Sequence, residues 1–178
     1  MRTTPLGVGR APAAQAMPVD EPRHVVVTVN GRLYPLEVSV DERLLDTLRT
    51  RLGLYGARYG CGTGHCGACV VVRNDEETVP SCLVLTARLD GQRVTTYEGY
   101  QQDRRLKSLM DAFAEEGAAQ CGYCTPGMLV SLRLLLEKEA RVTEDVVRTA
   151  LLSHICRCTG YYAPVRAVMK VVGADAVD

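Results

Sequence analysis

The chain has 178 residues, with 21 basic and 21 acidic side chains and a formal net charge of zero. Because these charges are balanced and interspersed, the composition does not indicate a nucleic-acid-binding protein. No apolar run approaches the roughly 20 residues that a membrane-spanning helix needs. We therefore expect a chain without a membrane span, folded as one domain or two small ones.

Residues 1–22 are rich in Ala, Pro and Gly and show neither a helical nor a strand period, which predicts a disordered tail. The segment has no twin-arginine pair and no apolar core of a secretory signal. We therefore expect the protein in the cytoplasm. In that compartment paired cysteines more often bind metal than form disulfides.

Residues 23–98 have the pattern of a small α+β domain. Alternating valines at 25, 27 and 29 predict a strand, and Asn30-Gly31 predicts a two-residue hairpin turn into a second strand over 33–40. Pro35 lacks an N–H group, which favours an edge position for that second strand.

A helix is expected next, because leucines at 44, 45, 48 and 52 follow helical spacing between a candidate N-cap at Asp41 and a stop at Gly53. After a glycine-rich loop, 70–72 predicts a strand, 73–78 a polar turn and 93–97 a closing strand.

Residues 99–178 predict an all-α four-helix domain. Leu106, Leu109 and Phe113 mark a first helix that ends at Gly117, and Thr125-Pro126 has the pattern of an N-cap and N1 proline for a second. A third helix should begin at Thr143, and a fourth should lie between Pro164 and Gly173.

The eight cysteines fall into two sets of four. Cys61, Cys66, Cys69 and Cys82 have CxxxxCxxC spacing followed by twelve residues and a cysteine, whereas Cys121, Cys124, Cys156 and Cys158 form a CxxC and a CxC motif. A [2Fe–2S] cluster needs four thiolates, two per iron, so the count suggests two clusters. Each half of about 80 residues is small enough to need such a staple.

The first set has the spacing of plant-type ferredoxins, and the hairpin and helix before it match a β-grasp ferredoxin-like fold. Its glycines let backbone N–H groups approach sulfur closely. A structural zinc site or two disulfides are the alternatives, although zinc knuckles usually pair CxxC with CxxC. His65 is expected outside the ligand set, since a Rieske centre would need two histidines.

The second set begins just before a helix N-terminus, where the helix dipole favours anionic sulfur. Two antiparallel helix pairs would bring the CxxC and CxC loops together at one end of the bundle. From the spacing alone, a zinc site stays open here too.

Three ordered motifs now resemble a known family. They are Gly60-Cys61-Gly62 through Cys69, Gln120-Cys121-Gly122-Tyr123-Cys124-Thr125-Pro126-Gly127-Met128, and Cys156-Arg157-Cys158-Thr159-Gly160-Tyr161. Together they look like the signatures of the small iron–sulfur subunit of molybdenum hydroxylases. These enzymes include xanthine dehydrogenase, aldehyde oxidoreductase and aerobic carbon monoxide dehydrogenase relatives. The resemblance covers about residues 24–172.

This resemblance implies a ferredoxin-like [2Fe–2S] domain followed by a helical [2Fe–2S]-binding domain. It also implies a large subunit that oxidises substrate at molybdopterin-bound molybdenum and usually a medium FAD subunit, assembled as a dimer of heterotrimers. The second cysteine set would then take the electron first, and the first set would pass it to FAD or another acceptor. No catalytic residue is expected in this chain.

Gln120 matches the glutamine whose amide contacts the pterin cofactor in the family, and its donors and acceptor suit that role. The chain departs from the family before the CxC motif, where Ser153-His154-Ile155 stands in place of the common Gly-Asn and an apolar residue. This puts in doubt the cofactor hydrogen bonds that an asparagine would make. We do not expect His154 to be a ligand, since four thiolates suffice.

Two other functions remain open from sequence: a free-standing ferredoxin and a zinc-stapled adaptor without a redox role. The Gln120 and CxC motifs argue against the free carrier, because they mark a docked partner. The substrate of the assembled enzyme, whether carbon monoxide, a purine, an N-heterocycle or an aldehyde, does not follow from this chain.

Overall fold

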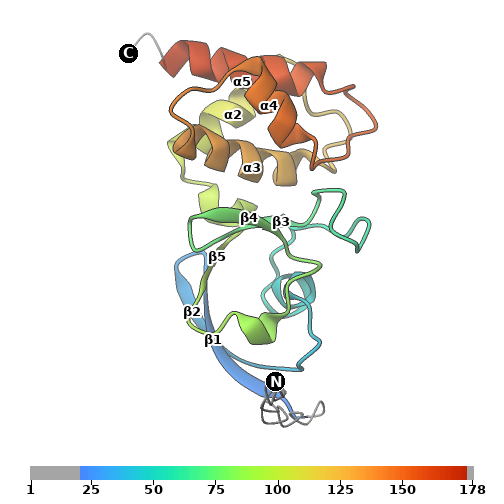
Figure 1. Cartoon of the computed structure of the whole chain (residues 1–178), viewed down its shortest axis with the longest axis vertical. Helices are drawn as coiled ribbons and strands as arrows, with labels where there is room; N and C mark the ends of the chain where they lie inside the picture. Colours follow the sequence, from blue (N-terminus) through green and yellow to red (C-terminus); the bar gives the residue numbers. More distant parts are fainter. Residues whose placement is uncertain (1–20, 176–178) are drawn as a thin grey trace, which may run out of the picture.

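The computed structural model of the chain describes residues 21–175, so the predicted tail over 1–22 lies outside the described residues except for its last two positions. The described part has a sheet-containing half and a helical half, stacked along the long axis of the molecule (Figure 1). This confirms the predicted α+β class with a ferredoxin-like part before a helical part.

The sheet has five strands in the order β2-β1-β5-β3-β4. Their bounds are Arg23–Val29 for β1, Arg32–Val38 for β2, Val70–Arg73 for β3, Glu77–Pro80 for β4 and Arg93–Thr95 for β5. The β1–β2 hairpin turns at Asn30 and Gly31, both at positive φ, as the Asn-Gly dipeptide predicts. Pro35 lies on the edge strand β2, where its missing N–H leaves no ladder bond unmade.

Two local predictions in this half are wrong. The sequence predicts a polar turn over 73–78, but only the first part of that range is a turn, because residues 77–80 form strand β4 and pair with β3. The predicted helix is present over residues 44–51, as α1 at Leu44–Asp46 continued by a π-helical segment at Thr47–Arg51, but its predicted N-cap is wrong. Arg43, not Asp41, precedes it as N-cap, without a side-chain capping bond, while the Asp41 carboxylate accepts a hydrogen bond from Ser39.

The helical half contains the four predicted helices, α2 at Arg104–Glu115, α3 at Thr125–Lys138, α4 at Glu144–Leu151 and α5 at Tyr162–Asp175. Thr143, the predicted start of the third helix, is the N-cap of α4 and accepts a bond from the Val146 N–H at 3.4 Å. Two ends differ from the prediction: Cys124 is the N-cap of α3 in place of Thr125, and α5 begins two residues before Pro164 and continues past Gly173.

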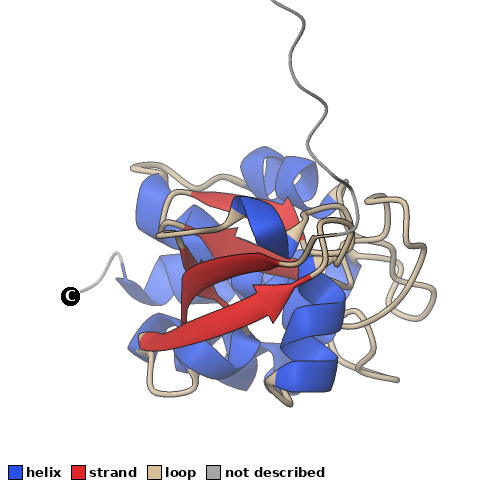
Figure 2. Cartoon of the chain, turned by 90° about the horizontal axis from the view of Figure 1, so that it is seen from below, coloured by secondary structure: helices blue, strands red, loops and turns tan. Residues whose placement is uncertain are grey.

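Strand β3 joins the two hydrophobic cores. Its alternate side chains point to opposite faces, so Val71 packs in the sheet core while Val70 and Val72 pack with the helices. Met128 and Leu129 of α3 belong to that second core. Viewed from below, the twisted strands lie in front of the helical half (Figure 2). The strand that follows Cys69 therefore carries packing for both halves.

The predicted boundary between residues 98 and 99 falls inside a 3-10 helix at Tyr97–Tyr100, and it stays a prediction. Within residues 21–175, no helix is both long and apolar enough to cross a bilayer.

Asp103 fixes the beginning of α2 and ties it to α3. One carboxylate oxygen accepts the Leu106 N–H at 2.8 Å, and the other accepts Arg133 Nη2 at 2.9 Å. The Arg133 guanidinium also lies 4.6 Å from the centre of the Tyr100 ring. Burial would raise the pKa of Asp103, but the bonds from Arg133 and Leu106 outweigh it and lower the pKa below the ordinary 3.8.

We predict that Asp103→Ala lowers the free energy of unfolding by about 2 kcal/mol, through loss of the cap and of the Arg133 partner. Because the folded pKa is the lower one, this difference should be present above pH 4 and disappear as the pH falls through that pKa. Urea denaturation at pH 7 and at pH 3 measures both. Exposed Asp111→Ala on the same helix is the control, and an equal loss from both variants would contradict the assignment.

Candidate metal centres

The first cysteine set lies on the loop before β3 and just beyond β4. Cys69 and Cys82 are 2% exposed and belong to the sheet core, whereas Cys61 is exposed and Cys66 half-buried. The four thiols interact as neighbours, with Cys61 beside Cys66 and Cys69 beside Cys82. The hairpin of β3 and β4 thus brings the distant Cys82 to the three loop cysteines.

Backbone N–H groups of the loop point at its sulfurs. Thr63 and His65 donate to Cys61 Sγ at 3.4 and 3.3 Å, and Cys61 donates to Cys66 Sγ at 3.4 Å. A Cβ at Gly60 would lie 2.5 Å from Cys66 Sγ, so only glycine leaves room for that sulfur. The loop is shaped around the thiols, as its glycine pattern predicts.

The two pairs of this set differ in environment. Hydrogen bonds from Thr63 lower the pKa of the exposed Cys61 thiol to about 5. Burial raises the pKa of Cys69 to about 11, and contact with Cys82 adds to the rise. Cys61 thus favours the thiolate in a metal-free chain, while the buried Cys69 needs a cation to compensate its charge.

The second set lies at one end of the helical half. Cys121 and Cys124 precede α3, and Cys156 and Cys158 lie on the loop between α4 and α5. Cys124, as N-cap, is placed at the positive end of the α3 dipole. Cys121 contacts Cys158 and Cys124 contacts Cys156, so the two motifs meet as the sequence predicts.

This set also has an outer and an inner pair. Cys121 and Cys158 are exposed, and Cys124 and Cys156 are half-buried. A bond from the Tyr123 backbone lowers the pKa of Cys121. Burial raises the pKa of Cys124 to about 12, with the Cys156 thiol contributing.

All eight cysteines are free thiols. Two contacting pairs per set fit the two-per-iron demand of a [2Fe–2S] cluster, and the glycine cradle and N–H donors fit its sulfur ligands. Among residues 21–175, no three Cys, His, Asp or Glu side chains converge tightly enough to hold a single metal ion. The ligand assignment stays a prediction.

Contacts between the two cysteine loops join the halves. Arg58 donates to the Gly122 carbonyl at 2.7 Å and stacks on the Tyr123 ring, and the Tyr123 hydroxyl donates to the Tyr59 carbonyl at 2.5 Å. On the other side, the Ile155 N–H donates to the Cys66 carbonyl at 3.0 Å. Each motif of the second set is therefore bonded to the first loop.

Two glycines let these loops touch. A Cβ at Gly127, on the first turn of α3, would lie 2.2 Å from the Gly67 carbonyl oxygen. A Cβ at Gly67 would lie 2.1 Å from His154 Nδ1 and 2.6 Å from the Ser153 carbonyl oxygen. The helix end and the CxC loop therefore approach the first loop at backbone distance.

A cavity of about 310 Å³ opens at this junction. It is lined by Cys61 and Cys66 of the first set and by all four cysteines of the second, together with Gly60, Ala68, Tyr123, Ile155 and Arg157. Both cysteine sets thus border one largely apolar space.

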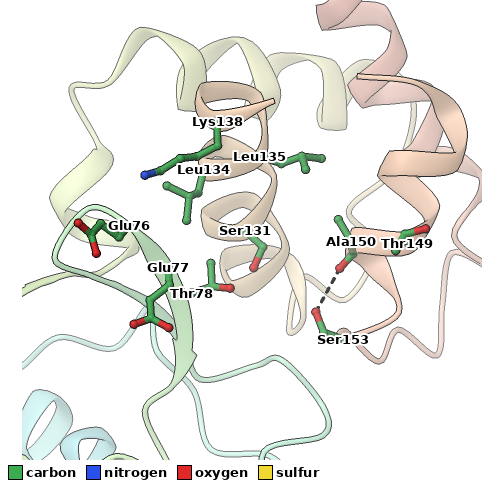
Figure 3. Close-up of a pocket in the computed structure, with 10 residues that line it drawn as sticks. All are labelled: Glu76, Glu77, Thr78, Ser131, Leu134, Leu135, Lys138, Thr149, Ala150 and Ser153. Carbon is green, nitrogen blue, oxygen red and sulfur yellow. Dashed lines mark hydrogen bonds between the residues drawn. The ribbon is translucent and has the colours of Figure 1, made fainter. Parts of the chain in front are cut away.

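A larger cavity, of about 420 Å³, lies away from the cysteines. Figure 3 shows it between Glu76 of the β3–β4 turn and Glu77 of β4, the α3 side chains that include Ser131 and Lys138, and the end of α4. No cysteine lines it, so its size does not make it the centre of the chemistry.

The remaining predicted residues lie next to one or the other cysteine set. Gln120 is exposed beside Cys121, and its cofactor contact stays a prediction. His65 is exposed with Nδ1 3.1 Å from the Thr63 hydroxyl. Tyr123 is half-exposed, whereas the Tyr161 hydroxyl accepts the Cys156 N–H at 2.8 Å.

His154 is 2% exposed, and its Nε2 lies 2.9 Å from the Ser131 hydroxyl. Nδ1 faces the Gly67 backbone without a hydrogen bond of good geometry. Burial lowers the pKa of His154 to about 4 against an opposing effect of the Gly67 backbone, so the imidazole is neutral at pH 7.

Sequence reasoning missed the residues that join the halves. Nothing in the sequence distinguishes Arg58 from the other arginines. The contacts of Gly67 and Gly127 are made with residues distant in sequence. The glycines of the cysteine motifs do indicate that another part of the chain comes close to the backbone, but they do not indicate which part.

We predict that Gly67→Ala destabilises the chain by about 1–3 kcal/mol more than Gly91→Ala. Both glycines have φ near +70°, so both variants carry the same left-handed strain, but only position 67 faces a neighbour. Urea denaturation of the two variants gives the difference. Equal losses would show that the contact with His154 and Ser153 is easily relieved.

Known proteins resemble the chain over most of its length. Residues 27–96 match the family described as 2Fe-2S iron-sulfur cluster binding domain, and residues 96–169 match the [2Fe-2S] binding domain family. The nicotinate dehydrogenase small FeS subunit of Eubacterium barkeri is 38% identical, covering 76% of this chain and 85% of its own. The nicotine 6-hydroxylase small subunit of Paenarthrobacter nicotinovorans is 42% identical, covering 83% and 88%.

Solved structures agree. Quinoline 2-oxidoreductase from Pseudomonas putida 86 contains a chain with TM-score 0.80 and 34% identity, covering 88% of this chain and 96% of its own. Aldehyde oxidoreductase from Desulfovibrio gigas matches with TM-score 0.77 and 39% identity over 86% of this chain but only 17% of its own. Two adjoining [2Fe–2S]-binding domains and these relatives place the chain in the family of small iron–sulfur subunits of xanthine dehydrogenase and aldehyde oxidoreductase type molybdenum hydroxylases.

Proposed function

We propose that the chain relays electrons from a molybdopterin site in a large subunit to FAD in a medium subunit, using two [2Fe–2S] clusters. The observation that carries this proposal is the junction, where two four-thiol sites border one cavity and are bonded to each other through backbone. When bound, each cluster takes up and releases one electron at a time.

The thiol contacts suggest how each cluster is held. Cys61 and Cys66 would share one iron of the first cluster, and Cys69 and Cys82 the other. In the second cluster the pairs would be Cys121 with Cys158 and Cys124 with Cys156. This pairing follows the four contacts between thiols, and in each set it would place the two less exposed thiols on one iron and the two more exposed thiols on the other.

The exposed face of the second set supports its place next to the large subunit. Cys121 and Cys158 are exposed there beside Tyr123 and Ile155, which are 51% and 59% exposed. Large apolar side chains around exposed thiols favour a covering partner. Gln120, next to Cys121, would then reach the pterin cofactor of that partner.

The direction of flow follows from this placement. The second set would receive the electron first and the first set would pass it to the FAD subunit, within a dimer of heterotrimers. Relatives named for nicotinate, nicotine and quinoline oxidation favour an N-heterocycle over carbon monoxide as the substrate class of the assembled enzyme.

The first test is metal content. The full chain, purified with its partners or reconstituted, should hold about four irons and four acid-labile sulfides that belong to this chain. His65→Ala should keep all four irons, because its exposed ring lies within hydrogen-bond distance of the Thr63 hydroxyl and is not needed as a ligand. Zinc without sulfide would overturn the proposal.

The second test is a ligand variant. Cys158→Ser should lower the iron of the chain from about four to about two and stop turnover with a dye that accepts electrons from the first cluster. Substrate binding by the large subunit should persist. Full dye-coupled turnover with the second cluster missing would show that the relay order is wrong.

A further inference from the structure

His154 occupies an unusual position between the two cysteine loops. It is the one histidine among the buried polar side chains of residues 21–175, and it lies two residues before Cys156. Its ring is held on one side by the Ser131 hydroxyl of α3, at 2.9 Å from Nε2. On the other side Nδ1 lies against Gly67, the residue that follows Cys66 in the first cysteine loop.

The imidazole fills the space that a side chain at position 67 would need. Because Gly67 has no Cβ and a φ of +70°, the loop can turn its backbone onto the ring and onto the Ser153 carbonyl. His154 therefore contacts the first cysteine loop from the second domain and is anchored to α3 at the same time.

The backbone around His154 is held by hydrogen bonds. The His154 carbonyl accepts the Tyr161 hydroxyl at 3.1 Å, and that hydroxyl accepts the Cys156 N–H. The next N–H, of Ile155, donates to the Cys66 carbonyl. A shift of the imidazole would therefore move the Ile155–Cys66 bond, which connects a ligand of one cluster to the neighbour of a ligand of the other.

We propose that His154 is a positioning residue, which seats the loop of Cys156 and Cys158 against the loop of Cys66 and thereby sets the coupling between the two clusters. This inference rests on the proposed function, because it requires both clusters. It assigns a role to the position at which the chain departs from the Gly-Asn pattern of its family.

The test compares EPR spectra of the fully reduced protein, in its assembled form, for two variants and two controls. Two paramagnetic centres close together split or broaden each other's signals. His154→Ala removes the ring, and Ser131→Ala removes only its anchor and keeps a good helix former in α3. The controls are His24→Ala on an exposed strand position and Ser108→Ala, an exposed helix serine.

We expect both variants to keep about four irons per chain and to lose the splitting between the cluster signals, while the controls retain it. Unchanged splitting in a fully loaded Ser131→Ala protein would overturn the proposal, as would a loaded unsubstituted protein without splitting. If His154→Ala does not bind iron, Ser131→Ala alone decides. If Ser131→Ala also fails to load, the contact is a folding requirement and the positioning role is wrong.

These outcomes are distinct from failure of the proposed function. An unsubstituted protein without iron–sulfur signals would refute the clusters and the positioning role together. Two normal cluster signals whose splitting is unchanged in both His154→Ala and Ser131→Ala would refute the positioning role alone.

Discussion

The close approach of backbone to backbone at Gly67 is the contact on which the arrangement of this protein depends. Side chains at position 67 or 127 would push the first cysteine loop away from α3 and from the CxC loop. With glycine at both, the Ile155 N–H reaches the Cys66 carbonyl, and Arg58 reaches the Gly122 carbonyl. Two sites that belong to different folds are thus held at one junction by one main-chain bond and one bond from an arginine side chain to a main-chain carbonyl.

The same region supplies the hydrophobic packing. Strand β3 begins one residue after Cys69 and divides its valines between the sheet core and the helical core. The buried thiols of Cys69 and Cys82 belong to the first of these cores, so the proposed cluster ligands and core residues are neighbours. Losing a cluster should therefore loosen both packing and docking, since unpaired buried thiolates are costly.

Much of the fold followed from local pattern. The Asn-Gly hairpin, edge Pro35, the Thr143 cap and the four helices each rest on chemistry within a few residues. Local pattern failed at two helix N-caps. Arg43 takes the position predicted for Asp41, and Cys124 takes the position predicted for Thr125. Cysteine spacing predicted which thiols come together, but Arg58, Gly67 and His154 act across the junction, and no local pattern indicates a partner about 60 to 90 residues away.

The central claim is that one chain holds two different [2Fe–2S] clusters at a shared junction. Spin quantification by EPR of the fully reduced, purified protein measures this directly. We predict about two unpaired spins per chain, in two signals of different g values, because the two thiolate environments differ in burial and hydrogen bonding. One signal, or none in a protein that contains zinc, would contradict it.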